Sequence, residues 1–221
     1  MTTKSEMTLG ENDHVERILR DRIATHELSP GSKLGEAALA KEFGISRSRV
    51  REILNVLAQK ELVKRIPNRG AVVAKMDAEQ LSQIYDLFEV LEGLTARLAC
   101  MNSQPSDWDE LSELFGKPME EAVANGDVGA LFSAVGCYRE TALRLARNDF
   151  LSQTLNGIYD RTQMIIRRTL ILPGRAKLSL EEHQMIIAAM RRGDVEAAER
   201  CKLNNMKSAR DAINKYIDFV L

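Results

Sequence analysis

Residues 34–74 contain the feature that most restricts how this chain can fold. Apolar residues at helical spacing lead into Gly44-Ile45-Ser46, and a second periodic apolar run follows over residues 50–57. Gly44 can adopt the left-handed conformation that ends a helix, and the Ser46 hydroxyl can cap the N–H groups that open the next one. The pattern predicts two short helices joined by a tight turn, which is the helix-turn-helix motif.

The segment after the second predicted helix indicates a β-hairpin. Residues 62–65 and 71–74 are β-prone, and they flank Pro67-Asn68-Arg69-Gly70. These four residue types are typical of a tight turn. A hairpin at this place would be the wing of a winged helix-turn-helix, with Arg69 at its tip.

Positive charge is concentrated in the same stretch. Between Lys41 and Lys75 there are nine Lys or Arg residues and three acids, although the whole chain sums to −1. The second helix opens with cations and hydroxyls, which the helix dipole disfavours unless an external anion such as DNA phosphate compensates. The alternative is an ordinary solvated basic face, but the order of turn, cap and hairpin favours DNA binding. The predicted DNA-binding residues are Ser46, Arg47, Ser48, Arg49, Arg51, Arg69 and Gly70.

Several motifs in this stretch resemble the winged-helix domain of GntR-family transcription regulators over about residues 12–76. The motifs are Pro30-Gly31-Ser32-Lys33-Leu34, Leu39-Ala40, Gly44-Ile45-Ser46-Arg47, Val50-Arg51-Glu52 and Pro67-Asn68-Arg69-Gly70. Two positions differ from many members, since Arg49 replaces a proline and Ala37 replaces a DNA-contacting arginine. The resemblance implies a DNA-binding domain of this type.

Length and composition fit a soluble protein of two domains. The chain has 221 residues, of which 44% are hydrophobic and 29% charged. Residues 1–76 carry 14 basic and 10 acidic side chains, and the remainder carries 17 and 22, so only the first part suits a polyanion. No apolar run is long enough to span a bilayer, and we expect a cytoplasmic protein without membrane contact. Three scattered cysteines predict reduced thiols and no disulfide framework.

The predicted fold class is mainly α. We expect a disordered tail over residues 1–10, a winged helix-turn-helix domain over 11–76 with a first helix in 11–26, and an all-helical domain over 77–221. A helix of about 25 residues should follow Asp77 and join the domains directly, because no Gly/Ser/Pro linker stands there. The pattern then predicts about six helices in the second domain. Their expected starts include a serine cap at Ser106 and a capping box opened by Ser179.

Polar residues interrupt the inward apolar stripe on three of these helices. They are Arg139, His183 and Asn205. An inward arginine needs an anionic partner, because burying an unpaired charge is costly. One reading is a polar pocket in which Arg139 is a fork for a carboxylate or phosphate, with Arg161 and Arg168 as further donors. The alternative is that Arg139 pairs with a nearby Glu or extends its charged end to solvent, and that His183 and Asn205 satisfy buried backbone groups.

The second half resembles the FCD, or FadR-like, ligand-binding domain. The motifs are Leu91-Glu92-Gly93 with Ala96-Arg97-Leu98-Ala99, Asn148, Glu182-His183, Gly193-Asp194 and Ala198. Many FCD domains bind a divalent metal, and the matching positions here are Val135, Arg139, His183 and Asn205. Only His183 keeps a metal-ligand type, so the resemblance implies that the metal site is lost and no cofactor is expected. Arg139 would then supply the positive charge for an anionic effector.

The predicted function is that of a homodimeric transcription regulator. It would bind double-stranded operator DNA, and a small organic acid or acyl effector in the helical domain would control its affinity. The alternative is a constitutive dimeric repressor with no effector. An enzyme is disfavoured, because the sequence contains no evident nucleophile–base pair, phosphate-binding glycine loop or carboxylate dyad.

Overall fold

The computed structural model describes residues 3–25, 27–67 and 70–221, with side chains described from Asp13 onward. The chain divides into two compact units, whose main boundary falls between Met76 and Asp77. Residues 159–165 are grouped with the first unit. Each unit is described below by itself.

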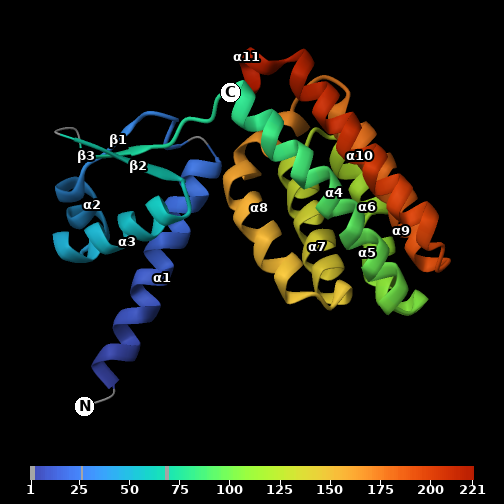
Figure 1. The fold of residues 1–221 in the computed structure, drawn as a ribbon, viewed down its shortest axis with the longest axis horizontal. Helices are drawn as coiled ribbons and strands as arrows, with labels where there is room; N and C mark the ends of the chain where they lie inside the picture. The colour runs from blue at the N-terminus through green and yellow to red at the C-terminus, as the bar shows by residue number, and fades with distance from the viewer. Residues whose placement is uncertain (1–2, 26, 68–69) are drawn as a thin grey trace. The chain divides into compact units, whose positions relative to one another are not determined.

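Three helices build the N-terminal unit. They are α1 (Thr3–Ala24), α2 (Glu36–Phe43) and α3 (Arg47–Gln59), labelled in Figure 1. Their apolar faces share one core, which includes Leu19, Leu39 and Leu54. Helix α1 begins at Thr3, so it extends through most of the segment 1–10 for which a disordered tail was expected.

The turn between α2 and α3 has the chemistry predicted from its residue types. Gly44 has φ +66° and its N–H donates to the Ala40 carbonyl, which ends α2. The Ser46 hydroxyl accepts a hydrogen bond from the Arg49 N–H at 3.3 Å, which caps α3. The helix-turn-helix is therefore confirmed at the level of its turn and its cap.

A small antiparallel sheet completes the N-terminal unit. Strands β2 (Val63–Ile66) and β3 (Gly70–Val73) form the wing hairpin, and β1 (Lys33–Leu34) pairs with the other edge of β3. The register places Lys64 opposite Val72 and Lys33 on the other side of Val72. The hairpin was predicted, whereas β1 was not, because two residues carry no alternation to detect. Arg69, the predicted wing tip, lies outside the described residues.

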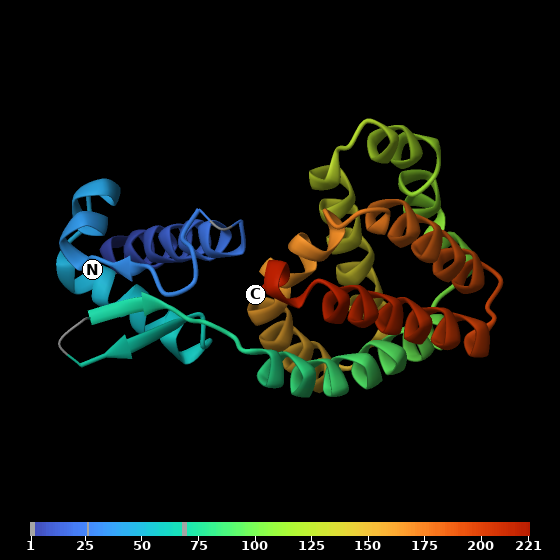
Figure 2. The same cartoon turned by 90° about the horizontal axis from the view of Figure 1, so that it is seen from above.

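The C-terminal unit is a bundle of helices. In chain order they are α4 (Ala78–Asn102), the 3₁₀ turn η1 (Pro105–Trp108), α5 (Asp109–Leu114), α6 (Lys117–Ala124), α7 (Val128–Ala146), α8 (Asp149–Leu170), α9 (Arg175–Arg191), α10 (Val195–Lys215) and α11 (Ile217–Val220). Figure 2 shows α4, drawn in green, along an outer edge of this bundle. The largest core side chain is Trp108, which is fully buried.

Side-chain caps fix several of these helix starts. Asp77 caps α4 by accepting from the Gln80 N–H at 2.8 Å, and Gln80 returns a bond to complete a capping box. Asp127 and Asn148 cap α7 and α8 in the same way. The 25-residue helix after Asp77 is confirmed.

Two predicted helix starts are wrong. Ser106 is not a cap, because Pro105 already occupies the first turn of η1 and Gln104 is the cap; the helical region then breaks at Gly116. Ser179 does not open its helix either, since α9 begins at Arg175 after Gly174 at φ +76°. Arg175 belongs to the buried face of α9, where it pairs with Glu182, and this extends the helix by a turn.

The fold class predicted from the sequence is confirmed. Within residues 70–221 the structure has no strand after Val73, and the helical unit has its own apolar core. Among the described residues, no helix is both long and apolar enough to cross a membrane.

Candidate DNA-binding surface and a buried polar cluster

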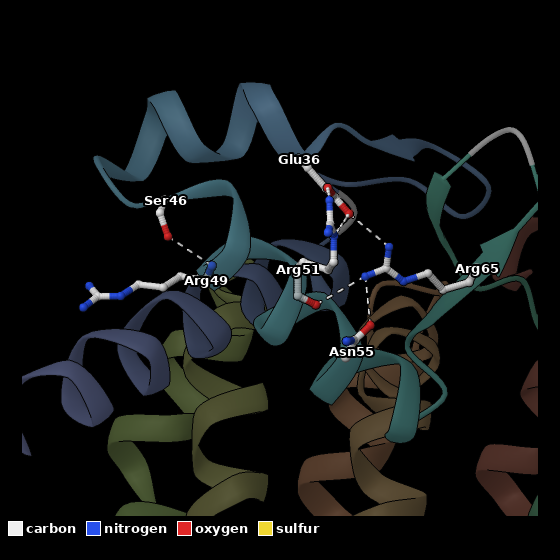
Figure 3. A network of polar contacts seen from close by, with 6 residues as sticks. All are labelled: Glu36, Ser46, Arg49, Arg51, Asn55 and Arg65. Carbon is white, nitrogen blue, oxygen red and sulfur yellow. Dashed lines mark hydrogen bonds and ion pairs between the residues drawn. The ribbon is translucent and has the colours of Figure 1, made fainter. Parts of the chain in front are cut away.

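The N-terminal end of α3 presents cations and hydroxyls, and its first turn contributes no acidic residue. Arg47 and Ser48 are exposed, and the first turn of α3 contains no acidic residue. In Figure 3 the Arg49 side chain extends from this turn, away from the other labelled side chains. Positive side chains and free N–H groups at a helix start form a site that suits a phosphate.

Glu36 links the recognition helix to the wing. Its carboxylate accepts from Arg51 Nη2 at 2.9 Å and from Arg65 Nη1 at 3.0 Å. Arg65 on β2 also donates to Asn55 at 2.8 Å and to the Arg51 carbonyl at 3.3 Å. Figure 3 shows this network, which joins α2, α3 and β2 through their polar side chains.

The charge pairing changes the acidity of Glu36. Hydrogen bonds from Arg51 and then Arg65 lower the pKa of the Glu36 carboxyl to about 2. Glu36 is thus ionised at physiological pH and holds both guanidinium groups in place. The sequence indicated Arg51 as a DNA contact but not its partners Glu36 and Arg65, nor the Asn55 that Arg65 contacts, since contacts that are distant in sequence leave no local pattern.

The structure describes fewer of the predicted DNA-binding residues in the wing than at the start of α3. Lys64 and Arg65 are exposed on β2, and Gly70 opens β3 at φ +81°, a conformation that favours glycine. Of the predicted contacts, Ser46, Arg47, Ser48, Arg49 and Arg51 lie together at the start of α3.

A second group of polar residues is buried inside the helical unit. Lys202 Nζ lies 3.0 Å from a Glu92 carboxylate oxygen, and both side chains are less than a tenth exposed. Lys202 also donates to the Asn205 Oδ1 at 3.4 Å. Asn205 Nδ2 in turn donates to Glu182 at 2.7 Å, and Glu182 accepts from Arg175 at 2.9 Å. We call Glu92, Arg175, Glu182, His183, Lys202 and Asn205 the polar cluster.

His183 is the unusual member of the polar cluster. Its Nδ1 lies 2.7 Å from the Ser179 carbonyl, which requires a proton on Nδ1 and leaves Nε2 as an acceptor. Nε2 is buried and has no hydrogen-bond partner among the described residues. The ring stacks on Phe115 at 5.3 Å and meets the Tyr138 ring edge-on at 5.4 Å. Burial, with the Lys202 and Arg175 charges, lowers the pKa of His183 to about 3.

The predicted effector residues are only partly brought together. Asn205 is hydrogen-bonded to Glu182 and Lys202, and His183 follows Glu182 in the sequence and lies within the influence of the Lys202 charge. Arg139 on α7 is half-buried and donates to Asn156 Oδ1 at 2.7 Å. Its neighbour Tyr138 contacts the polar cluster, with Lys202 Nζ 5.3 Å from the ring centroid.

Arg161 and Arg168, the two further predicted effector donors, are not members of the polar cluster. Arg168 donates to the Val220 carbonyl at 2.9 Å and lies over the Phe219 ring. Arg161 belongs to the segment 159–165 that is grouped with the N-terminal unit. Glu92, Arg175 and Lys202 were not predicted from the sequence. A pattern for two of them was present, since Glu92 and Lys202 interrupt the apolar faces of α4 and α10 with opposite charges.

The polar cluster does not fit a divalent metal. Of the positions matched to metal ligands, Val135 and Arg139 cannot ligate one, and Asn205 is already bonded to Glu182. The Lys202 ammonium lies beside Asn205 and would repel a cation. Across the described part of the chain, no three His, Cys, Asp or Glu side chains gather in a way that could hold a metal ion.

A capped second helix of a helix-turn-helix, a wing and a separate all-helical unit together form the architecture of a DNA-binding transcription regulator with a second, helical domain. Residues 11–73 match the family described as bacterial regulatory proteins of the gntR family, and residues 83–207 match the FCD domain. The chain belongs to the GntR-family transcriptional regulators that carry an FCD domain. The family and the resemblance inferred from the sequence therefore agree.

Characterised relatives are similar over most of their length. The galactonate operon transcriptional repressor of Escherichia coli is 26% identical and covers 92% of this chain and 96% of its own. The gluconate operon transcriptional repressor of Bacillus subtilis is 26% identical and covers 80% of this chain and 74% of its own. These relatives are regulators of transcription, not enzymes.

Solved structures share the fold. E. coli McbR/YncC has a TM-score of 0.79 at 23% identity and covers 93% of this chain and 98% of its own. A GntR regulator from Rhodococcus sp. RHA1 has a TM-score of 0.74 at 21% identity, with the same coverage of both chains.

Proposed function

We propose that this regulator binds double-stranded operator DNA as a homodimer, with the start of α3 in the major groove and the wing beside it. The observation that carries the proposal is the acid-free first turn of α3, where Arg47 and Ser48 are exposed and Ser46 caps the helix. Two recognition helices related by a two-fold axis would read half-sites about one helical turn apart. The Glu36 network would fix the angle between α3 and the wing.

Arg47→Ala tests the DNA contact. The operator is recovered first, by sequencing genomic fragments that the purified protein retains, and is then titrated by fluorescence anisotropy. We expect a loss of about 1–3 kcal/mol in binding free energy if Arg47 contacts a base. Lys177→Ala is the matched control, since Lys177 is an exposed cation on α9. Equal affinities for both variants and the wild type would remove Arg47 from the interface.

We infer that a small organic acid controls DNA binding from the helical unit. One observation supports this: the buried His183 Nε2 has no hydrogen-bond partner among the described residues. A buried polar atom normally has a hydrogen-bond partner, and a hydroxyl of a bound ligand would donate to Nε2. A hydroxy acid offers such a donor, and galactonate and gluconate, for which two relatives' operons are named, are hydroxy acids.

We propose that Arg139 supplies the positive charge that binds the carboxylate of the effector. Within the polar cluster, Glu92 and Glu182 already compensate Lys202 and Arg175. An added carboxylate therefore needs another cation, and Arg139 follows Tyr138 on the helix that contacts the cluster. Its planar fork can donate two hydrogen bonds to one carboxylate. Asn205 would orient the ligand, and Arg161 and Arg168 remain secondary predicted donors.

A thermal-shift and calorimetric screen of hydroxy acids, including gluconate and galactonate, tests the effector. A bound acid should raise the melting temperature and change operator affinity, and Arg139→Ala should abolish both effects while leaving effector-free DNA binding intact. Arg192→Ala, an exposed arginine after α9, is the control. If no acid shifts melting or affinity and DNA binding persists, the constitutive dimeric repressor is the better description.

A further inference from the structure

Helix α4 has an outward apolar stripe in addition to its buried face. Leu87, Val90 and Met101 are 61%, 65% and 62% exposed. Leu91, Leu94 and Leu98 lie between them and are partly exposed. In Figure 2, α4, drawn in green, runs along an outer edge of the helical unit.

The spacing along this stripe is that of a helix-pairing seam. Leu87, Leu91, Leu94, Leu98 and Met101 follow one another at alternating steps of four and three residues. Such a sustained pattern is the signature of a helix that packs along a second helix, and it differs from scattered surface leucines. The occupant should therefore be a helix with a similar apolar seam.

Charges beside the seam indicate which helix this is. Asp86 and Arg97 are 11 residues apart in the sequence, about three turns, so they stand on the same side of α4 at opposite ends of the seam. Each contacts α10, Asp86 with Arg210 at 2.7 Å and Arg97 with Glu199 at 4.0 Å, yet their side chains remain 62% and 47% exposed. One edge of α4 thus carries opposite charges at its two ends.

We propose that this face of α4 is the surface through which two copies of the chain pair. In an antiparallel two-fold arrangement, Leu91 would lie opposite Leu94 and Leu87 opposite Leu98 of the second copy. A two-fold axis perpendicular to both helices keeps each edge on its own side. Asp86 of one copy then lies beside Arg97 of the other, and the pair forms twice. The face is therefore self-complementary in the spacing of its apolar residues and in its charges.

This inference rests on the proposed homodimer and names the surface that forms it. Sedimentation equilibrium of the full chain gives the dissociation constant of the dimer for wild type and variants. Val90→Glu should raise that constant at least tenfold, because Val90 lies in the exposed apolar stripe beside the seam and the variant puts one carboxylate from each copy there. Met185→Glu is the matched control, since Met185 is a 55% exposed methionine on α9, and it should leave the constant unchanged.

Charge reversal makes the test specific to this pairing. Asp86→Arg and Arg97→Asp should each raise the dimer dissociation constant, and the double variant should restore it toward the wild-type value, with circular dichroism confirming that each variant folds. A dimeric wild type whose constant is unchanged by all these variants would overturn the α4 surface and leave the proposed function intact. A monomeric wild type at micromolar concentration would overturn both the surface and the homodimer, whereas salt-dependent DNA binding would still support the recognition helix.

Discussion

The ammonium of Lys202 and the carboxylate of Glu92 lie 3.0 Å apart in the interior of the helical unit, on α10 and α4. Neither charge has enough solvent contact to be stable alone, so each depends on the other. Since α4 and α10 pack along each other, this pair fixes their relative register.

Lys202→Met should destabilise the helical unit by roughly 3–5 kcal/mol, because it leaves Glu92 buried without a counter-charge. Trp108 is the only tryptophan of the chain and is buried in this unit, so its fluorescence reports unfolding of this part in denaturant. Adding Glu92→Gln should recover a large share of the loss. Lys207→Met, at an exposed lysine of α10 near Glu89, should have little effect. Equal small losses at both lysines would contradict a buried ion pair.

Stability should fall between pH 6.5 and pH 3 through His183. The unfolded histidine binds a proton below its ordinary pKa near 6.5, whereas the native ring stays neutral down to about pH 3. The unfolded state therefore binds more protons in this window, which costs on the order of 2 kcal/mol at pH 5. The measurement compares denaturant unfolding at pH 7 and pH 5, followed by Trp108 fluorescence.

His183→Gln should reduce that pH dependence, while replacement of the exposed His14 should not. If the free energy of unfolding of His183→Gln falls with pH as steeply as that of the wild type, other titrating groups cause the loss of stability between pH 7 and pH 5.

Glu36→Gln should loosen the connection between α3 and the wing. The depressed pKa of Glu36 means that its ionised form stabilises the fold above pH 4.5, and that this contribution is lost as the pH falls toward 2. Its size should be on the order of 1 kcal/mol, because the arginine partners are partly exposed. Hydrogen exchange of α3 amides measures this locally, and exchange should be faster in the variant at pH 7.

The same variant should bind DNA with less discrimination. Removing one negative charge favours any DNA, whereas releasing Arg51 and Arg65 weakens their placement, so the ratio of operator to random-sequence affinity should fall several-fold. Glu52→Gln removes one acid from α3 and is the control. A ratio that falls equally in both variants would assign the effect to net charge alone.

Local chemistry made the N-terminal unit predictable from the sequence. The turn at Gly44, the cap at Ser46 and the hairpin residues each specify a conformation within a few positions, and the structure has all three elements. Helix lengths were predictable for the same reason wherever a cap such as Asp77 stands at the start. The helix starts predicted at Ser106 and Ser179 were wrong, because a serine can cap a helix but need not. Tertiary packing determined where both helices begin.

The polar cluster was harder to predict. His183 and Asn205 were recognised as inward polar residues, but the partners of a buried charge lie on other helices, and periodicity does not pair helices. The pairs Lys202 with Glu92 and Arg175 with Glu182 required three-dimensional coordinates. The Arg139 contact with Asn156, one helix away, is of the same kind.

The salt dependence of operator binding tests the central claim most directly. Each phosphate that a basic side chain neutralises contributes roughly −0.9 to the slope of log K against log salt, so a dimer that uses several cations per copy should show a slope of several negative units. The titration uses the operator duplex recovered from genomic fragments, with Arg47→Ala measured in parallel. The account predicts a steep slope and weaker binding by the variant. A slope near zero, or no fragment retained at all, would contradict DNA binding by this surface.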